Sequence, residues 1–195
     1  MKKVIFLIIF LFNFNLLSIS AGELSVTAGG KENEHKKAYF AGGCFWCMEE
    51  SFDKVKGVIK SISGYSGGHV KNPTYRQVIY KDTGHVEAIE VLYDPKFTNY
   101  EELLKVFWVN IDPFDADGQF CDKGKSYRSV AFYQNQKEKK LIESSVSTIE
   151  KKFNKKKIVT LIWEFEIFYP AEDYHQNYYQ NNFLRYLAYK SGCQR

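Results

Sequence analysis

The sequence has little of what a metal-binding protein usually displays. Only four of its 195 residues are histidines, and they show no spacing typical of metal ligands. Its four cysteines include one close pair, Cys44 and Cys47, whereas Cys121 and Cys193 stand alone. A zinc site would need a second close pair of soft ligands. We therefore expect neither a metal nor a cofactor.

An excess of one sign of charge is also lacking. The formal net charge is +4, and without residues 1–21 the chain keeps 25 basic and 23 acidic residues. Such a balance gives no reason to expect a nucleic-acid partner or attraction to a membrane surface. The chain shows no internal repeat, and its length is that of one domain with a sizeable core. We expect a monomer.

The first 21 residues are typical of a secretory signal peptide. Lys2 and Lys3 precede an apolar run over 4–17, and small residues follow at Ser18, Ser20 and Ala21. The apolar run is shorter than the roughly 20 residues that span a membrane. Residues 22–36 are small and polar, which predicts a linker before a catalytic domain at 37–195. We expect an exported, periplasmic protein, anchored to the membrane if the signal stays uncleaved.

Apolar periodicity predicts strands interleaved with helices. Thr98 and Glu101 form an expected capping box, residues 112–125 a long loop, and the tail from Pro170 an irregular aromatic segment. The pattern predicts an α+β fold: one domain with a mixed sheet, a ferredoxin-like two-layer core, helices packed on it and long irregular loops. The expected strands lie at 37–41, 59–65, 85–93, 128–133 and 160–168, and the expected helices at 45–56, 98–110 and about 141–153.

Cys44 and Cys47 lie where a predicted strand gives way to a predicted helix. The N–H groups and the positive end of the helix dipole would face the Cys44 sulfur and favour its thiolate. Cys47 would lie about one helical turn away. The spacing favours thiol chemistry over two structural disulfides or a metal site. It leaves the reaction open, because a C-x-x-C pair is also typical of a thiol–disulfide oxidoreductase.

Five segments along the chain, the first of which contains Cys44 and Cys47, resemble segments of one protein family. They read GGCFWCMEE, SGYSGGHVKNPTYRQV, TGHVEAIEVLYDP, KSYRSVAFY and FYPAEDYHQNYY. Together they resemble the A type of the peptide methionine sulfoxide reductases, which reduce the S epimer at sulfur, over residues 38–195. The resemblance implies repair of oxidised proteins and reduction of free methionine sulfoxide. It also implies recycling by thioredoxin or a thioredoxin-like dithiol protein.

The resemblance implies that Cys44 is the nucleophile and becomes a sulfenic acid. It implies that Glu87 protonates the departing sulfoxide oxygen. Alternation along residues 85–93 independently places Glu87 on a face with apolar residues, where the pKa of a carboxyl rises. The opposite face of this strand is also largely apolar, so this support is partial. Tyr75 and Tyr127 match tyrosines that hydrogen-bond the sulfoxide oxygen without carrying charge.

Substrate-binding residues follow from the same resemblance. Phe45 and Trp46 match the apolar walls around the methyl group, which aromatic faces suit well. Asp122 matches an orienting aspartate near the pocket. His175 and Tyr178, in the tail, match positions that help to close the site.

The cysteine that resolves the sulfenic acid is left open, because many family members have glycine where this chain has Cys47. Cys47 has the advantage of proximity, but a helical C-x-x-C must distort its first turn to reach disulfide geometry. Cys193 needs only a flexible tail, so we expect it to act last, with a relay through Cys47 as the rival. Cys121 is either a relay member or a loop cysteine.

Two other functions remain as alternatives. One is a thiol–disulfide oxidoreductase acting through the Cys44–Cys47 pair, although none of the four prolines lies in a loop where a thioredoxin-like fold would need one. The other is a secreted binding domain whose four cysteines form two structural bridges.

Overall fold

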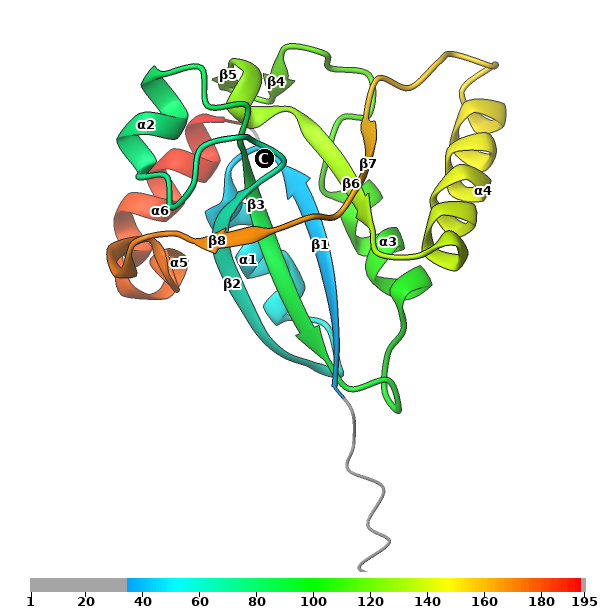
Figure 1. Ribbon diagram of the computed structural model, residues 1–195, viewed down its shortest axis with the longest axis horizontal. Coiled ribbons are helices and arrows are strands. Elements are labelled where there is room, and N and C mark those ends of the chain that lie inside the picture. Colours follow the sequence, from blue (N-terminus) through cyan, green and yellow to red (C-terminus); the bar gives the residue numbers. More distant parts are fainter. Residues whose placement is uncertain (1–34, 194–195) are drawn as a thin grey trace, which may run out of the picture. The chain divides into compact units, whose positions relative to one another are not determined.

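Six strands form one mixed sheet in the computed structural model, which describes residues 35–193 (Figure 1). The expected signal peptide and nearly all of the expected linker lie outside the described residues. The strand order is β7-β6-β1-β3-β2-β8, and only the pairing of β6 with β7 is parallel. The predicted mixed sheet is confirmed. Its strands are β1 (Lys36–Gly42), β2 (Val58–Ser66), β3 (Val86–Tyr93), β6 (Ser129–Tyr133), β7 (Leu161–Glu164) and β8 (Phe168–Pro170).

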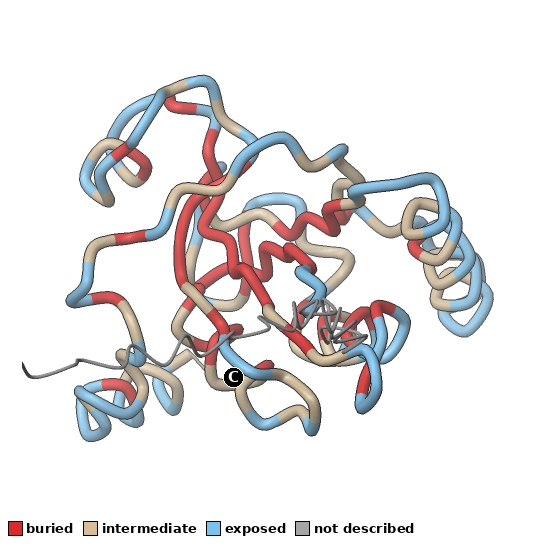
Figure 2. Tube along the Cα trace, turned by 60° about the horizontal axis from the view of Figure 1, so that its bottom comes forward, coloured by how far each residue is buried: buried red, intermediate tan, exposed pale blue. Residues whose placement is uncertain are grey.

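One face of the sheet is covered by α1 (Phe45–Asp53) and α3 (Tyr100–Val109). In α1 the apolar residues follow helical spacing, so Met48 and Phe52 both point into the core and are fully buried. The helix α4 (Gln136–Lys152) packs beside α3 with one fully buried residue, Ile142. Figure 2 shows the same gradient, with buried residues along the central strands and exposed ones in the outer helices and loops.

The other face is covered by the segment that joins β7 to β8. The sequence predicts one strand over 160–168, but the structure has two, and they pair with opposite edges of the sheet. Between them the Phe165 N–H donates to the Tyr133 carbonyl, and the chain then runs across the sheet (Figure 1). Aromatic side chains of this segment pack on the sheet, among them Phe165, stacked on Tyr39 at 3.7 Å between ring centroids. Both faces of the central strands are therefore buried.

Helix caps account for two differences from the sequence analysis. A helix missed there, α2 (Tyr75–Tyr80), starts at a complete capping box between Thr74 and Gln77. At α3 the N-cap is Asn99 and not Thr98, because the Asn99 side chain accepts from the Glu102 N–H at 3.1 Å. The Asn side chain, placed one residue later, satisfies a free donor at the helix start.

The segments predicted as irregular contain short elements. The loop after α3 holds a small hairpin of β4 (Gly118–Gln119) and β5 (Asp122–Lys123), followed by a 3-10 turn (Lys125–Tyr127). A 3-10 turn (Asp173–His175) and two helices, α5 (Tyr178–Asn181) and α6 (Phe183–Gly192), replace the expected irregular tail. Within residues 35–193 no helix is long and apolar enough to cross a membrane.

Candidate active site

Cys44 lies at the junction between β1 and α1, where it is the N-cap residue of the helix. Gly42 and Gly43 lead into it. A Cβ atom at Gly42 would lie 2.5 Å from the Met48 sulfur, and Gly43 has a φ of +74°. These glycines therefore let the strand turn tightly into the helix while α1 packs against the sheet. The turn brings Cys44 into the interior, where it is 4% exposed.

Glu87 reaches the same point from β3, the strand next to β1. Its side chain is 2% exposed, so its predicted burial on an apolar strand is confirmed. The Phe45 N–H, the first of α1, donates to Glu87 Oε2 at 3.0 Å. The Glu87 carboxyl thus accepts from a backbone N–H that has no partner within the helix. The Cys44 side chain makes no capping hydrogen bond.

Cys44 and Glu87 line one small cavity of about 40 Å³. Seven of the residues predicted for the site take part in it, coming from α1, α2, β3, the β4–β5 hairpin and the 3-10 turn that follows. Tyr189, from α6, is an eighth that the sequence analysis did not identify. The cavity is lined by Cys44, Phe45, Trp46, Tyr75, Glu87, Asp122, Tyr127 and Tyr189.

The two predicted tyrosines, Tyr75 and Tyr127, hydrogen-bond each other beside Glu87. Burial raises the pKa of Tyr75 to about 12, and the charge of Glu87 adds to the shift. Burial and Glu87 also raise the pKa of Tyr127. Both phenols therefore stay neutral near pH 7 and can donate hydrogen bonds to an oxygen in the cavity.

His175 and Tyr178 do not line the cavity but contact one of its walls, Trp46. The Trp46 Nε1–H donates to His175 Nδ1 at 3.2 Å, and the Tyr178 ring stacks on the Trp46 ring at 3.8 Å. Burial lowers the pKa of His175 to about 4, so its ring is neutral near pH 7 and can accept this hydrogen bond. Their contacts fix the orientation of the tryptophan ring.

The expectation of a Cys44 thiolate is wrong for the protein at rest. Burial raises the pKa of the Cys44 thiol well above its usual range, and the neighbouring Cys47 and the charge of Glu87 raise it further. A hydrogen bond between Tyr189 and the ionised sulfur opposes these effects. The free-energy cost of removing a thiolate from water is thus larger than the stabilisation that the N-terminus of α1 gives it. Spacing along the sequence cannot predict which of the two effects is larger.

The four cysteines fall into two pairs of different kinds. Cys121 and Cys193 form a disulfide with 5.1 Å between their Cα atoms. Cys44 and Cys47 are buried thiols that form no disulfide, and their side chains hydrogen-bond each other. The alternative with two structural bridges predicted two disulfides, so it does not fit. The cysteine expected to resolve the sulfenic acid, Cys193, is already bonded to a partner 72 residues away in sequence.

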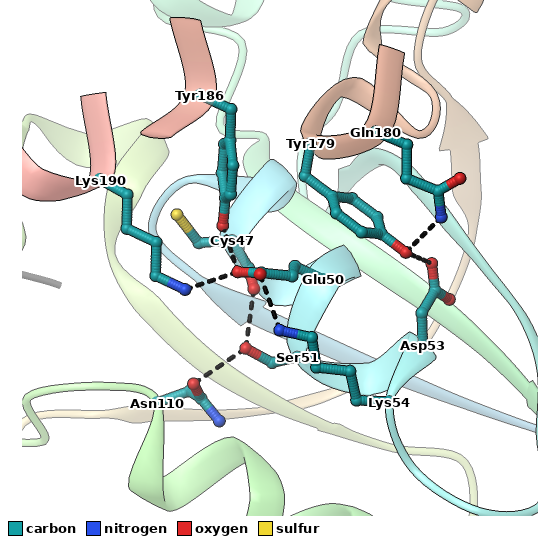
Figure 3. A network of polar contacts seen from close by, with 10 residues as sticks. All are labelled: Cys47, Glu50, Ser51, Asp53, Lys54, Asn110, Tyr179, Gln180, Tyr186 and Lys190. Carbon is teal, nitrogen blue, oxygen red and sulfur yellow. Dashed lines mark hydrogen bonds and ion pairs between the residues drawn. The ribbon is translucent and has the colours of Figure 1, made fainter. Parts of the chain in front are cut away.

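The tail is fastened to the exposed side of α1 by polar contacts (Figure 3). Glu50 accepts hydrogen bonds from Tyr186 at 2.6 Å, Lys190 at 2.5 Å and Lys54 at 2.7 Å. Burial of Glu50 alone would raise its pKa, but these three donors outweigh it and hold the pKa at about 2. Tyr186 also hydrogen-bonds Cys47, so α6 contacts both buried thiols through Tyr186 and Tyr189.

No group of three or more histidine, cysteine, aspartate or glutamate side chains suited to a metal occurs within residues 35–193. The described site thus consists of a buried thiol, a buried carboxyl, phenols and aromatic walls. Such a set suits attack by sulfur on a small electrophile that needs a proton.

Comparison with known proteins agrees with this chemistry. The family model of peptide methionine sulfoxide reductase matches residues 36–195. The chain belongs to this family. Two curated relatives, both called peptide methionine sulfoxide reductase MsrA, come from Listeria monocytogenes and Bacillus subtilis. They are 49% identical over 156 and 159 residues, which cover 80% and 81% of this chain and 88% and 90% of the relatives.

The fold of the reductase family is also found among solved structures. The reduced form of Mxr1 from Saccharomyces cerevisiae is similar with a TM-score of 0.71 and 31% sequence identity. The match covers 76% of this chain and 86% of the yeast chain. Methionine sulfoxide reductase A of Corynebacterium diphtheriae is also similar, with a TM-score of 0.71 and 29% identity, over 80% of this chain and 78% of that chain. The strands and helices that bring Cys44 and Glu87 together therefore form a fold that is found in a solved methionine sulfoxide reductase.

Proposed function

We propose that this protein reduces the S epimer of methionine sulfoxide to methionine, in oxidised proteins and as the free amino acid, and so repairs oxidative damage. The observation that carries the proposal is the convergence of the Cys44 sulfur and the Glu87 carboxyl on one buried cavity. Membership of the peptide methionine sulfoxide reductase family supports it.

In the first step the Cys44 sulfur releases its proton and attacks the sulfoxide sulfur, which forms an S–S bond, and the oxygen takes up a proton from Glu87 in its neutral acid form. The resulting hydroxyl then passes to Cys44 as the new S–S bond and the S–O bond of the substrate both break. The products are methionine and a Cys44 sulfenic acid, so the substrate is reduced by two electrons and the cysteine is oxidised by two. The proton is essential because an unprotonated sulfoxide oxygen is a poor leaving group.

The remaining cavity residues orient the substrate. Tyr75 and Tyr127 donate to the sulfoxide oxygen as neutral phenols in a site with little water. Phe45 and Trp46 enclose the methyl group, and Asp122 limits the cavity on another side. His175 and Tyr178 act indirectly, by holding the Trp46 ring.

Cys47 is our candidate for the cysteine that resolves the sulfenic acid. Its thiol lies against the Cys44 sulfur, whereas the Cys193 sulfur is bonded to Cys121. Attack by Cys47 on the sulfenic acid releases water and forms a Cys44–Cys47 disulfide. Thioredoxin or a thioredoxin-like dithiol protein then reduces this disulfide by thiol–disulfide exchange, once movement of the tail uncovers one of the two sulfurs. The two-residue spacing keeps the loop between the sulfurs short, so closure costs little entropy.

The alternative function, general thiol–disulfide exchange, is less well supported. A general exchanger begins by attacking the disulfide of its partner, so its sulfur must be accessible and ionised in the resting protein. Cys44 and Cys47 are 4% and 2% exposed, and burial raises the pKa of Cys44. The cavity admits a small group rather than a second protein surface.

Further parts of the proposal concern location, assembly and fold. We propose an exported, monomeric enzyme, and the signal-like residues 1–21 support its export. A ferredoxin-like classification of the core is supported by the antiparallel order β6-β1-β3-β2, with α1 joining β1 to β2. Detection of the chain in a periplasmic fraction, and its mass by light scattering, test the first two.

The proposed function is tested with N-acetyl-methionine sulfoxide, resolved into its two epimers, and dithiothreitol as reductant. We expect the wild type to form the thioether from the S epimer alone. Cys44→Ser should form none, and Glu87→Gln should be slower by at least about 100-fold because it cannot supply the proton. Disulfide exchange without any thioether, unaffected by Glu87→Gln, would instead identify a thiol–disulfide oxidoreductase.

A further inference from the structure

Tyr189 is the one cavity residue for which the sequence offered no role. It lies on α6, and its ring meets Trp46 edge-on with 6.1 Å between centroids. Its hydroxyl contacts two other cavity residues: it donates to Asp122 Oδ2 and hydrogen-bonds the Cys44 sulfur. The phenol therefore lies between the thiol and a carboxyl group that comes from the β4–β5 hairpin.

A phenol has one proton, so these two contacts have a defined polarity. While Tyr189 donates to the Asp122 carboxylate, its oxygen can only accept, and the partner that offers a proton is the Cys44 S–H. The three groups then form a chain of donors that runs from sulfur through the phenol to the carboxylate. Each proton along it points toward Asp122.

We propose that Tyr189 is a catalytic residue that passes the proton of the Cys44 thiol to the Asp122 carboxylate. The inference deepens the proposed function, on which it rests. In this step the S–H bond breaks and the sulfur proton joins the Tyr189 oxygen, while the former Tyr189 proton joins Asp122. A thiol and a carboxylate become a thiolate and a carboxylic acid, with no net change of charge in the cavity.

A buried thiol needs such a route before it can attack. Burial raises the pKa of Cys44, so the sulfur arrives at the reaction protonated. The groups that face it are Cys47, Glu87, Tyr75 and Tyr189. Glu87 accepts the Phe45 N–H and is needed as the acid for the sulfoxide oxygen. Tyr75 hydrogen-bonds another phenol, Tyr127, whereas Tyr189 joins the sulfur to a second carboxyl group, that of Asp122.

The disulfide holds the two ends of this path together. Cys121 directly precedes Asp122, and the Cys193 N–H donates to the Tyr189 carbonyl at 3.0 Å, one helical turn away. The bond between Cys121 and Cys193 thus ties the last turn of α6 to the hairpin that carries Asp122. Without it the phenol and the carboxylate would be joined only through noncovalent contacts.

The test measures single-turnover formation of methionine from the S epimer, without added reductant, by protein in which Cys44 and Cys47 are thiols and the Cys121–Cys193 disulfide is intact. Tyr189→Phe keeps the ring and should slow this step about tenfold or more, as expected for loss of a proton-transfer group. Asp122→Asn should slow it similarly, and the double variant should be no slower than the slower single one, because the two residues act as a unit. The matched control is Tyr179→Phe, which removes a tail hydroxyl bonded to Asp53 at 3.0 Å outside the cavity and should leave the rate unchanged.

A second readout does not use the reaction at all. Iodoacetamide labelling of Cys44, in a Cys47→Ser background, should move to higher pH in Tyr189→Phe, because the Tyr189 hydroxyl, once it holds the sulfur proton, donates a hydrogen bond to the thiolate. An unchanged rate and an unchanged labelling profile in Tyr189→Phe, with an active wild type, would overturn the relay. The relay would also be overturned if the double variant slowed the reaction by the product of the two single effects, because the two residues would then act independently. An inactive wild type would instead reject the proposed function and leave the labelling result to decide on the hydrogen bond.

Discussion

Two regions build the active site by different physical means. The frame (β1, α1, α3 and β3) supplies Cys44 and Glu87 from elements whose side chains are mostly buried in one apolar core. The tail (residues 171–193) supplies Tyr189 from a helix, α6, in which only Tyr186 is fully buried. Leu184 and Leu187 of that helix are 78% and 50% exposed. The frame is held by hydrophobic burial, the tail by polar contacts and a disulfide.

The difference between the two regions explains why the Cys44 sulfur and the Glu87 carboxyl lie in the frame, whereas the tail supplies a covering wall of the cavity. Nucleophile and acid must keep a fixed geometry, and a close-packed core holds them to it. The tail covers the same cavity with fewer buried apolar contacts, so it is the region expected to open locally at lower free energy. The cavity of about 40 Å³ is small, so entry of a protein side chain requires some movement of its walls. The tail is the wall best able to move.

The prediction with the largest expected effect concerns which of the two regions supplies the cysteine that resolves the sulfenic acid. Cys47 belongs to the frame and Cys193 to the tail. With a thioredoxin-type protein as reductant, Cys47→Ser should release one methionine per enzyme and then stall, whereas Cys193→Ser should turn over. Methionine per enzyme, counted against time, checks this. A stall in Cys193→Ser with normal turnover in Cys47→Ser would return the role to the tail cysteine.

The second prediction compares the stability that each region contributes. Phe52→Ala removes a fully buried ring that stacks on Phe40 at 5.2 Å between centroids, and should lower the free energy of unfolding by about 3–5 kcal/mol. Leu184→Ala, in the exposed part of α6, should change it by less than about 0.5 kcal/mol. Urea denaturation of both variants measures the difference. Equal losses would mean that α6 buries its apolar residues as the frame does.

The difference in burial between the frame and the tail also explains which site residues could be predicted from the sequence. Strand alternation indicated the buried face of Glu87, and three- and four-residue spacing indicated α1, because both patterns report burial in a core. Tyr189 has no such pattern: it is one of 14 tyrosines, on a helix whose apolar residues are largely exposed. The Thr74–Gln77 capping box was a local signal for α2 that went unused. The protonation of Cys44 depends on its surroundings in space, so spacing along the chain led to the wrong state.

The last prediction concerns Glu49, which joins the two regions. It lies on α1, is fully buried, and accepts the Asn177 N–H of the tail at 3.0 Å. Burial raises its pKa to about 7, although the Asn177 N–H opposes the shift. Between the unfolded pKa of 4.5 and about pH 7 the folded protein holds a proton that the unfolded chain has released. This group therefore makes the protein less stable as pH rises through that window.

Glu49→Gln keeps an acceptor for Asn177 but cannot ionise, so it removes this contribution. Relative to the variant, the wild type should lose about 1.4 kcal/mol of unfolding free energy per pH unit across the window. Urea denaturation of both proteins at pH 5 and pH 7.5 measures the difference. Burial lowers the pKa of His175 to about 4, so that residue acts in the opposite direction, but it is common to both proteins and cancels. Parallel pH dependence in the two proteins would mean that Glu49 ionises freely and that the tail releases it from burial.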